Sequence, residues 1–178
     1  MPGMMETVLN LGLNDRTVRG LAERSANPRF AYDAYRRFLQ GYASVVLGLP
    51  RAEGEEIFQK AKRRLGMSQD HQVPAAALMD VCRDLQAFAR HRTGRPFQQD
   101  TDDLLWGASE AVFRSWMAEK AVTYRRVERI EGLRGTAVNV VQMVFGNLGE
   151  TSGTGVCFTR DPNTGERTLY GDVLMNAQ

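Results

Sequence analysis

The stretch at residues 146–166, GNLGETSGTGVCFTRDPNTGE, decides how the chain is interpreted. Its first ten residues contain four glycines and the hydroxyls of Thr151, Ser152 and Thr154. Glycines let backbone amides approach a phosphate closely, and hydroxyls add hydrogen-bond donors. The same composition suits a mobile hairpin connection, because the segment lacks the GK[ST] ending of a Walker-type loop. This stretch alone therefore leaves a phosphate-binding loop and a plain hairpin both open.

The segments around this loop have the composition of β-strands. Residues 136–146, TAVNVVQMVFG, are β-branched and apolar and carry no helix caps, so they predict a strand. Residues 155–160 predict a second strand, 161–165 (DPNTG) a tight turn, and 168–178 a third strand. A three-stranded sheet with one uncovered face is hard to stabilise alone. We therefore expect the chain to be an excerpt of a larger protein.

Residues 28–130 have helical periodicity instead. Apolar residues spaced three and four apart predict a helix from Phe30 that Gly48 and Pro50 end. Three or four more helices follow, at 53–65 (with Leu65 facing inward), from Pro74 to Gly94, from about 100 to 116, and at 119–130. The predicted fold class is α+β. Its parts are an N-terminal loop and helix (1–27), a helical subdomain (28–130) beside part of an antiparallel sheet, and a β-hairpin part with the glycine-rich loop (131–178).

The bulk composition excludes several classes of protein. The 178 residues are 43% hydrophobic and 25% charged, with a net charge of +2, which is typical of a globular domain. Acidic residues are interleaved with the basic ones, so no nucleic-acid partner is expected. No apolar run approaches the ~20 residues of a membrane helix, so no membrane partner is expected either. Cys82 and Cys157 lie far apart without a CxxC pair, which favours a reducing, cytoplasmic location.

Three residues outside the glycine-rich loop are candidates for nucleotide chemistry. Met5, in MPGMM, could cover an aromatic ring such as adenine, although methionines more often fill a core. Asp172, on a predicted strand, could hold magnesium or simply lie on a solvated sheet face. Arg36, on the best-defined amphipathic helix, could meet a phosphate or be one more helix charge. The residues themselves leave these alternatives open.

Long segments taken together resemble a known family. MPGMMETVLNLGLND (1–15), FAYDAYRRFLQGY (30–42), LWGASEAVFRSW (105–116), GTAVNVVQMVFGN (135–147) and SGTGVCFTRDPNTGE (152–166) with LYGDVLMNAQ (169–178) closely resemble the N-terminal ATP-grasp nucleotide-binding domain of the pyruvate, phosphate dikinase family. The resemblance covers essentially the whole chain in the same order. It implies a partial ATP-grasp domain.

The resemblance also implies an activity for a full-length parent protein. Enzymes of this family interconvert ATP, phosphate and pyruvate with AMP, pyrophosphate and phosphoenolpyruvate, using Mg²⁺ and a phosphohistidine. The implied partners are ATP and the phosphohistidine and phosphoenolpyruvate/pyruvate domains of the same chain, and the parent is expected to be a cytoplasmic homodimer. The family's lysine-bearing strand, its acidic strand and its histidine have no counterpart in this sequence. We therefore expect the isolated segment to be inactive and to bind ATP weakly or not at all.

The resemblance transfers roles to particular positions. It implies that Met5 and the segment with Val141 and Met143 line the adenine pocket, and that Arg36 of the YRR motif contacts phosphate. It also implies that Ser152, Gly153, Thr154 and Gly155 form a phosphate-covering hairpin. Asp172 is implied to be a carboxylate near the nucleotide. Two positions depart from the family pattern. Val141 replaces a glutamine, which removes a side-chain contact, and Asp172 replaces a glutamate, which shortens its reach and puts a direct metal role in doubt.

Two other functions remain open at this point. A related ATP-grasp phosphotransferase similar to phosphoenolpyruvate synthase would share the hairpin, although we do not expect it to share MPGMM or the long helix at 30–42. A non-catalytic module would use the helices as an interaction surface, with the glycine-rich loop as a simple connection.

Overall fold

The structure is a computed structural model that describes residues 3–177. The chain divides into two compact units, one ending at Val141 and the other beginning at Gln142. The division lies later in the chain than residue 131, where the sequence predicts the β-hairpin part to begin. Each unit is described by itself.

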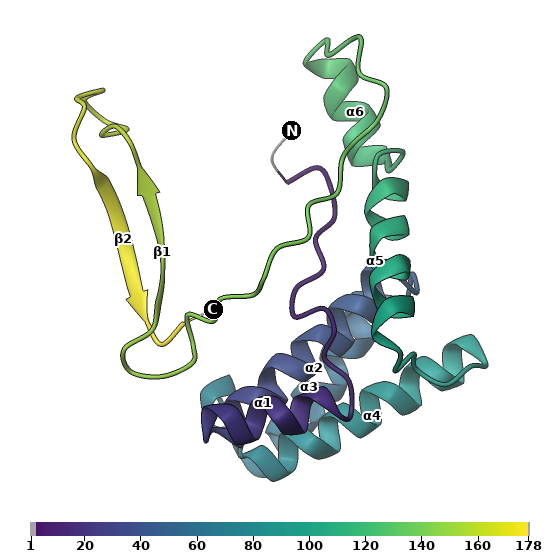
Figure 1. Ribbon diagram of the computed structural model, residues 1–178. Helices are drawn as coiled ribbons and strands as arrows, with labels where there is room; N and C mark the ends of the chain where they lie inside the picture. Colours follow the sequence, from purple (N-terminus) through teal and green to yellow (C-terminus); the bar gives the residue numbers. More distant parts are fainter. Residues whose placement is uncertain (1–2, 178) are drawn as a thin grey trace. The chain divides into compact units, whose positions relative to one another are not determined.

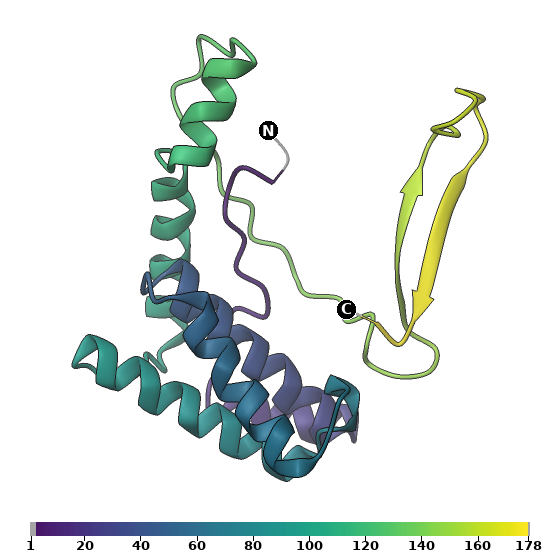
Figure 2. The same ribbon diagram turned by 180° about the vertical axis from the view of Figure 1, so that it is seen from behind.

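The first unit is helical (Figure 1). Its α-helices are α1 (Thr17–Ser25), α2 (Pro28–Val45), α3 (Arg51–Leu65), α4 (Ala75–Thr93), α5 (Thr101–Ser115) and α6 (Glu119–Val127), with a 3₁₀ helix at Asp70–Gln72. Helix α2 is central, since it contacts α1, α3, α4 and α5 (Figures 1 and 2). These elements confirm the helices predicted between residues 14 and 130.

Local hydrogen bonds explain where the helices begin and end. The Asn27 side chain accepts a hydrogen bond from the Phe30 amide (3.0 Å) and Pro28 occupies the first turn, so α2 begins there. The Asp100 carboxylate caps α5 in the same way. Helices α3 and α4 end at Gly66 (φ 66°) and Gly94 (φ 71°), in the left-handed conformation that glycine adopts without strain.

The core of this unit forms around α2. Phe30, Tyr35 and Phe38 of α2 are each 1% exposed, and Phe58 of α3 is fully buried against this helix. One predicted core position is wrong: Leu65 is 37% exposed, because it is the last residue of α3 and lies where the helix leaves the core.

The second unit is a β-hairpin. Strands β1 (Gly153–Phe158) and β2 (Tyr170–Met175) pair antiparallel, with Gly153 opposite Met175 and Phe158 opposite Tyr170. The turn beyond β1 contains DPNTG, where the Asp161 carboxylate accepts a hydrogen bond from the Asn163 amide (2.7 Å). The helices and this small sheet confirm the α+β class.

Two strand predictions are wrong. Residues 136–146, predicted as a strand, form no strand within the described part of the chain. A β-branched segment becomes a strand only when another strand satisfies its backbone groups, and none of the described residues pairs with it. Strand β1 also begins at Gly153 and not at Gly155 as predicted, so Gly153 and Thr154 lie in a strand and not in the loop.

Candidate functional site

The register of the hairpin puts Thr154 and Asp172 on the same face. Thr154 lies opposite Leu174 and Val156 lies opposite Asp172, so Thr154 and Asp172 are diagonal neighbours. Side chains in that relation have Cα atoms about 7–8 Å apart, within reach of one bridging ligand. Both side chains are exposed. A hydroxyl and a carboxylate therefore stand together on one open face of the hairpin.

The strand glycines lie on the opposite face, and the hairpin itself requires them. Gly153, Gly155 and Gly171 alternate with the Thr154 and Asp172 positions. A Cβ on Gly155 would meet the Asp172 carbonyl oxygen at 2.6 Å, and one on Gly171 would collide with the Val156 carbonyl. The close approach of the two strands therefore explains these glycines without any ligand.

The glycine-rich loop is tied to the ends of the strands. The Thr154 hydroxyl donates to the Ala177 carbonyl (2.7 Å), and the Asn176 amide donates to the Ser152 carbonyl (2.7 Å). Gly146 is buried there, and a Cβ on it would overlap the Thr154 Oγ1 and the Ala177 carbonyl. Within the described residues the Ser152 hydroxyl makes no hydrogen bond. The hydroxyl of the exposed Thr151 makes none either, so Thr151 and Ser152 both offer a hydroxyl to a ligand at this end of the hairpin.

Arg36 lies inside the helical unit. Its side chain is 4% exposed, and its Nη2 donates to the Asp33 carboxylate at 2.7 Å. Its Nη1 donates to Gln40 Oε1 at 2.6 Å, and its guanidinium lies 4.0 Å from the centre of the Phe58 ring. A contact with phosphate would require these interactions to open, and that contact stays a prediction.

The pKa of Asp33 is set by its burial and by its two arginine partners. Burial alone would raise the pKa of Asp33, but the charges and hydrogen bonds of Arg36 and Arg37 outweigh burial and hold the pKa below its ordinary value. The Asp33 carboxyl therefore remains ionised at neutral pH. The sequence contains the signal for this pair, an aspartate three residues before the arginine on a helix.

The candidate adenine residues are divided between the units. Met5 is half-buried in the first unit, where its sulfur receives a hydrogen bond from the Ser115 hydroxyl (3.8 Å). Val141, the last residue of that unit, is 79% exposed, and Met143 in the second unit is half-buried. Among the described residues, the candidates that the structure brings together inside one unit are those of the hairpin, namely Ser152, Gly153, Thr154, Gly155 and Asp172.

The described residues show no cluster of metal-ligating side chains, and the buried Cys82 thiol is not ionised. Residues 3–177 contain no group of three or more His, Cys, Asp or Glu side chains placed to hold a metal ion. Burial raises the pKa of Cys82 to about 12, so its thiol stays protonated. No helix in this part of the chain is long and apolar enough to cross a membrane.

Comparisons with known proteins decide the family. Residues 1–177 match the family described as "Pyruvate phosphate dikinase, AMP/ATP-binding domain". The chain belongs to the pyruvate phosphate dikinase family. This membership confirms the resemblance found in the sequence and does not favour the phosphoenolpyruvate synthase alternative.

Three curated relatives show the extent of the likeness. The chain is 51% identical to "Pyruvate, phosphate dikinase" of Clostridium symbiosum and 51% identical to the protein of that name from Rhizobium meliloti (strain 1021). It is also 51% identical to "Pyruvate, phosphate dikinase 1, chloroplastic" of Arabidopsis thaliana. All of this chain is covered in each case, against 20%, 20% and 18% of the relatives. The chain thus spans about a fifth of the length of these pyruvate phosphate dikinases.

Proposed function

We propose that this chain supplies part of the ATP site of a pyruvate, phosphate dikinase. The enzyme would interconvert ATP, phosphate and pyruvate with AMP, pyrophosphate and phosphoenolpyruvate through a phosphohistidine. The observation that carries the proposal is the match of residues 1–177 to an AMP/ATP-binding domain, together with 51% identity to named dikinases over the whole chain. The proposed partners are ATP, the phosphohistidine domain and the phosphoenolpyruvate/pyruvate domain of one cytoplasmic, homodimeric parent.

The β1–β2 hairpin is the proposed phosphate-covering element. A hydroxyl and a carboxylate share one of its faces, at Thr154 and Asp172, and the free hydroxyl of Ser152 lies just before β1. The proposed ligand of the Ser152 hydroxyl and of the backbone at Gly153 and Gly155 is the triphosphate. The Thr154 hydroxyl would join them once its bond to Ala177 has opened, and the Asp172 carboxylate, which repels phosphate, would face the magnesium that accompanies ATP. Hydroxyl and amide donors held in place before the reaction stabilise charge on a transferring phosphoryl group.

The adenine end of the proposed site uses Met5, Val141 and Met143. Met5 would cover the base, and the extended segment with Val141 and Met143 would present backbone groups to its edge. Arg36 is proposed as a phosphate contact in a conformation in which its guanidinium has left Asp33 and Gln40. The domain division 1–27, 28–130 and 131–178 is kept as part of the same proposal.

Magnesium requires more ligands than these residues provide. Mg²⁺ takes octahedral oxygen coordination, commonly from one or two carboxylates, phosphates and water. Asp172 would be one carboxylate, and the described residues do not gather others around it. Mg²⁺ is therefore proposed as a cofactor of the parent, and no step is assigned to it here.

The activity can be tested on a complete parent enzyme that contains this segment. Incubation with ATP, phosphate and pyruvate, followed by phosphorus NMR, should show AMP, pyrophosphate and phosphoenolpyruvate forming together. The 178-residue chain alone should form none of them. Formation of ADP in place of AMP by the parent would contradict the proposed function.

A further inference from the structure

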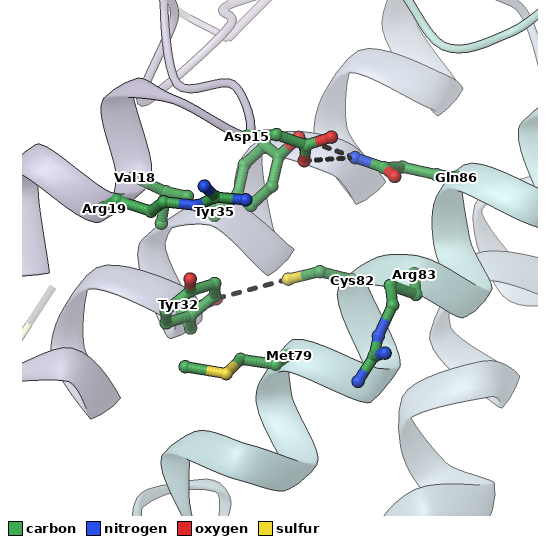
Figure 3. Close-up of a pocket in the computed structure, with 9 residues that line it drawn as sticks. All are labelled: Asp15, Val18, Arg19, Tyr32, Tyr35, Met79, Cys82, Arg83 and Gln86. Carbon is green, nitrogen blue, oxygen red and sulfur yellow. Dashed lines mark hydrogen bonds between the residues drawn. The ribbon is translucent and has the colours of Figure 1, made fainter.

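A groove in the first unit is lined by none of the candidate nucleotide residues. It runs between α1 and α4, both of which pack on α2, and has a volume of about 340 Å³. That volume falls within the roughly 300–1,000 Å³ of small-molecule sites. Its lining comes from α1, α2, α4 and, with Asp15, the segment just before α1: Asp15, Val18, Arg19, Tyr32, Tyr35, Met79, Cys82, Arg83 and Gln86 (Figure 3).

The floor of the groove is apolar. Val18 and Tyr35 are 1% exposed, and Cys82 is 3% exposed, with Met79 beside them. The Cys82 thiol donates to the Tyr32 carbonyl (3.6 Å), an interaction drawn in Figure 3. With its thiol protonated, Cys82 adds no charge to this floor, which therefore suits an aliphatic or aromatic group.

Two hydrogen bonds to the Asp15 carboxylate close one end of the groove. The Tyr35 hydroxyl donates to Asp15 Oδ1 (2.9 Å), and Gln86 Nε2 donates to the same oxygen (2.8 Å) (Figure 3). These two bonds hold the Asp15 side chain between α2 and α4. Its second oxygen, Oδ2, has no hydrogen-bond partner among the described residues.

An arginine of opposite charge lines the same groove. Arg19 lies in the first turn of α1, and its side chain and that of Asp15, which precedes the helix, both line the groove (Figure 3). Arg19 is exposed and forms no ion pair within the described residues. Arg83, on the opposite side, is already paired with Asp80. The charges of the groove without an ion pair among the described residues are therefore one carboxylate and one guanidinium.

We propose that this groove binds a free α-amino acid with an apolar side chain. Such a molecule carries both an ammonium and a carboxylate, which matches the opposite charges that Asp15 and Arg19 bring to one groove. The ammonium contacts Asp15 Oδ2, the carboxylate contacts the Arg19 guanidinium, and the side chain lies on Val18, Met79 and Cys82. Charge-assisted hydrogen bonds of both signs then select the zwitterion over a simple acid or amine.

Three probes test the ligand class on the 178-residue chain. L-Leucine carries both charges, N-acetyl-L-leucine lacks the ammonium, and L-leucinamide lacks the carboxylate. Isothermal titration should give L-leucine an affinity at least about tenfold higher than either analogue, since each loses a charge-assisted contact. Methyl-labelled methionine NMR should show the Met79 signal shifting with L-leucine. Equal affinities for the three probes, or an unmoved Met79 signal at tens of millimolar L-leucine, would overturn the proposal.

Matched variants test the assigned contacts. Asp15→Asn keeps an oxygen that can accept from Tyr35 and Gln86, and Arg19→Gln changes an exposed side chain, so circular dichroism should stay unchanged. Each should weaken L-leucine binding about tenfold. Arg24→Gln is the control, because Arg24 is an exposed arginine in the last turn of α1 that does not line the groove. Unchanged binding in Asp15→Asn and Arg19→Gln, or an equal loss in Arg24→Gln, would contradict the assignment.

Discussion

Removal of the Asp33 carboxylate should destabilise the helical unit strongly. Asp33 and Arg36 have side chains that are each 4% exposed, and their nearest atoms are 2.7 Å apart. Asp33→Ala leaves the buried guanidinium without its counter-charge, a change that costs about 3–5 kcal/mol in buried pairs. Gln40 and the Phe58 ring still contact Arg36, so we expect the lower end, about 3 kcal/mol.

The neighbouring arginine provides a matched control. Arg37 also pairs with Asp33, at 3.1 Å, but its side chain is 41% exposed. Arg37→Ala should therefore cost at most about 1 kcal/mol, as exposed ion pairs do. Replacing both buried partners, in Asp33→Leu with Arg36→Met, should recover most of the stability lost in Asp33→Ala, because no unpaired charge remains.

Urea unfolding followed by circular dichroism at 222 nm measures these differences, since the helical signal comes from the first unit. The midpoint should fall in Asp33→Ala while the slope stays the same. A loss below about 1 kcal/mol, or a loss equal to that of Arg37→Ala, would refute the reasoning.

The same pair predicts a pH dependence. Burial raises the pKa of Asp33, but Arg36 and Arg37 lower it by more than burial raises it. The pKa of Asp33 in the folded state is therefore below its value in the unfolded state. The stability from this ionisation is complete above the unfolded-state pKa of about 4 and is lost as pH falls through the folded-state value. The difference in unfolding free energy between wild type and Asp33→Asn should therefore shrink as pH falls below about 4. A constant difference between pH 7 and pH 2.5 would show that the carboxylate charge is not responsible.

Three further predictions concern the thiols, the glycine-rich loop and a helix cap. In the native chain a thiol reagent at pH 8 should modify the exposed Cys157. Cys82 is buried and its pKa is raised to about 12, so it should react only after urea is added. Rapid modification of both thiols without urea would contradict the burial of Cys82. Gly146→Ala should abolish the cross-strand NOEs between Gly153 and Met175, because the added Cβ would overlap Thr154 and Ala177. Gly149→Ala should keep these NOEs, since a Cβ there has nothing within 4 Å. Equal spectra for the two variants would contradict this prediction. Asp100→Ala should lower the unfolding free energy by about 1 kcal/mol, because the carboxylate accepts hydrogen bonds from the Asp102 and Asp103 amides, and an unchanged urea midpoint would exclude that role.

The helices could be predicted because their signals are local. Asn27 and Pro28 at the start of α2, Asp100 at the start of α5, and Gly66 and Gly94 at helix ends act within a few residues of the positions they define. Apolar spacing also indicated that the helix from Phe30 has a buried face. It failed at Leu65, where periodicity continues although the helix has left the core.

The strands depend on partners that composition does not reveal. Residues 136–146 have strand composition, but among the described residues no strand pairs with them. The loop boundary was misplaced because glycines suggest a loop, whereas Gly153 and Gly155 are required by the closeness of β2. Counting outward from the DPNTG turn would have placed Thr154 and Asp172 on one face, but the bond from Thr154 to Ala177 needs the coordinates.

The most direct test of the central claim is the KM for Mg·ATP of a parent enzyme carrying Asp172→Asn, compared with Glu166→Gln. Both variants remove one exposed carboxylate from the hairpin unit, but Asp172 shares its face with Thr154 and Glu166 lies in the distant turn. If this face lies against the nucleotide, Asp172→Asn should raise the KM at least about tenfold, the effect of losing a contact made by a charged group, and Glu166→Gln should leave it unchanged. An unchanged KM in Asp172→Asn, or equal increases in both variants, would contradict the account.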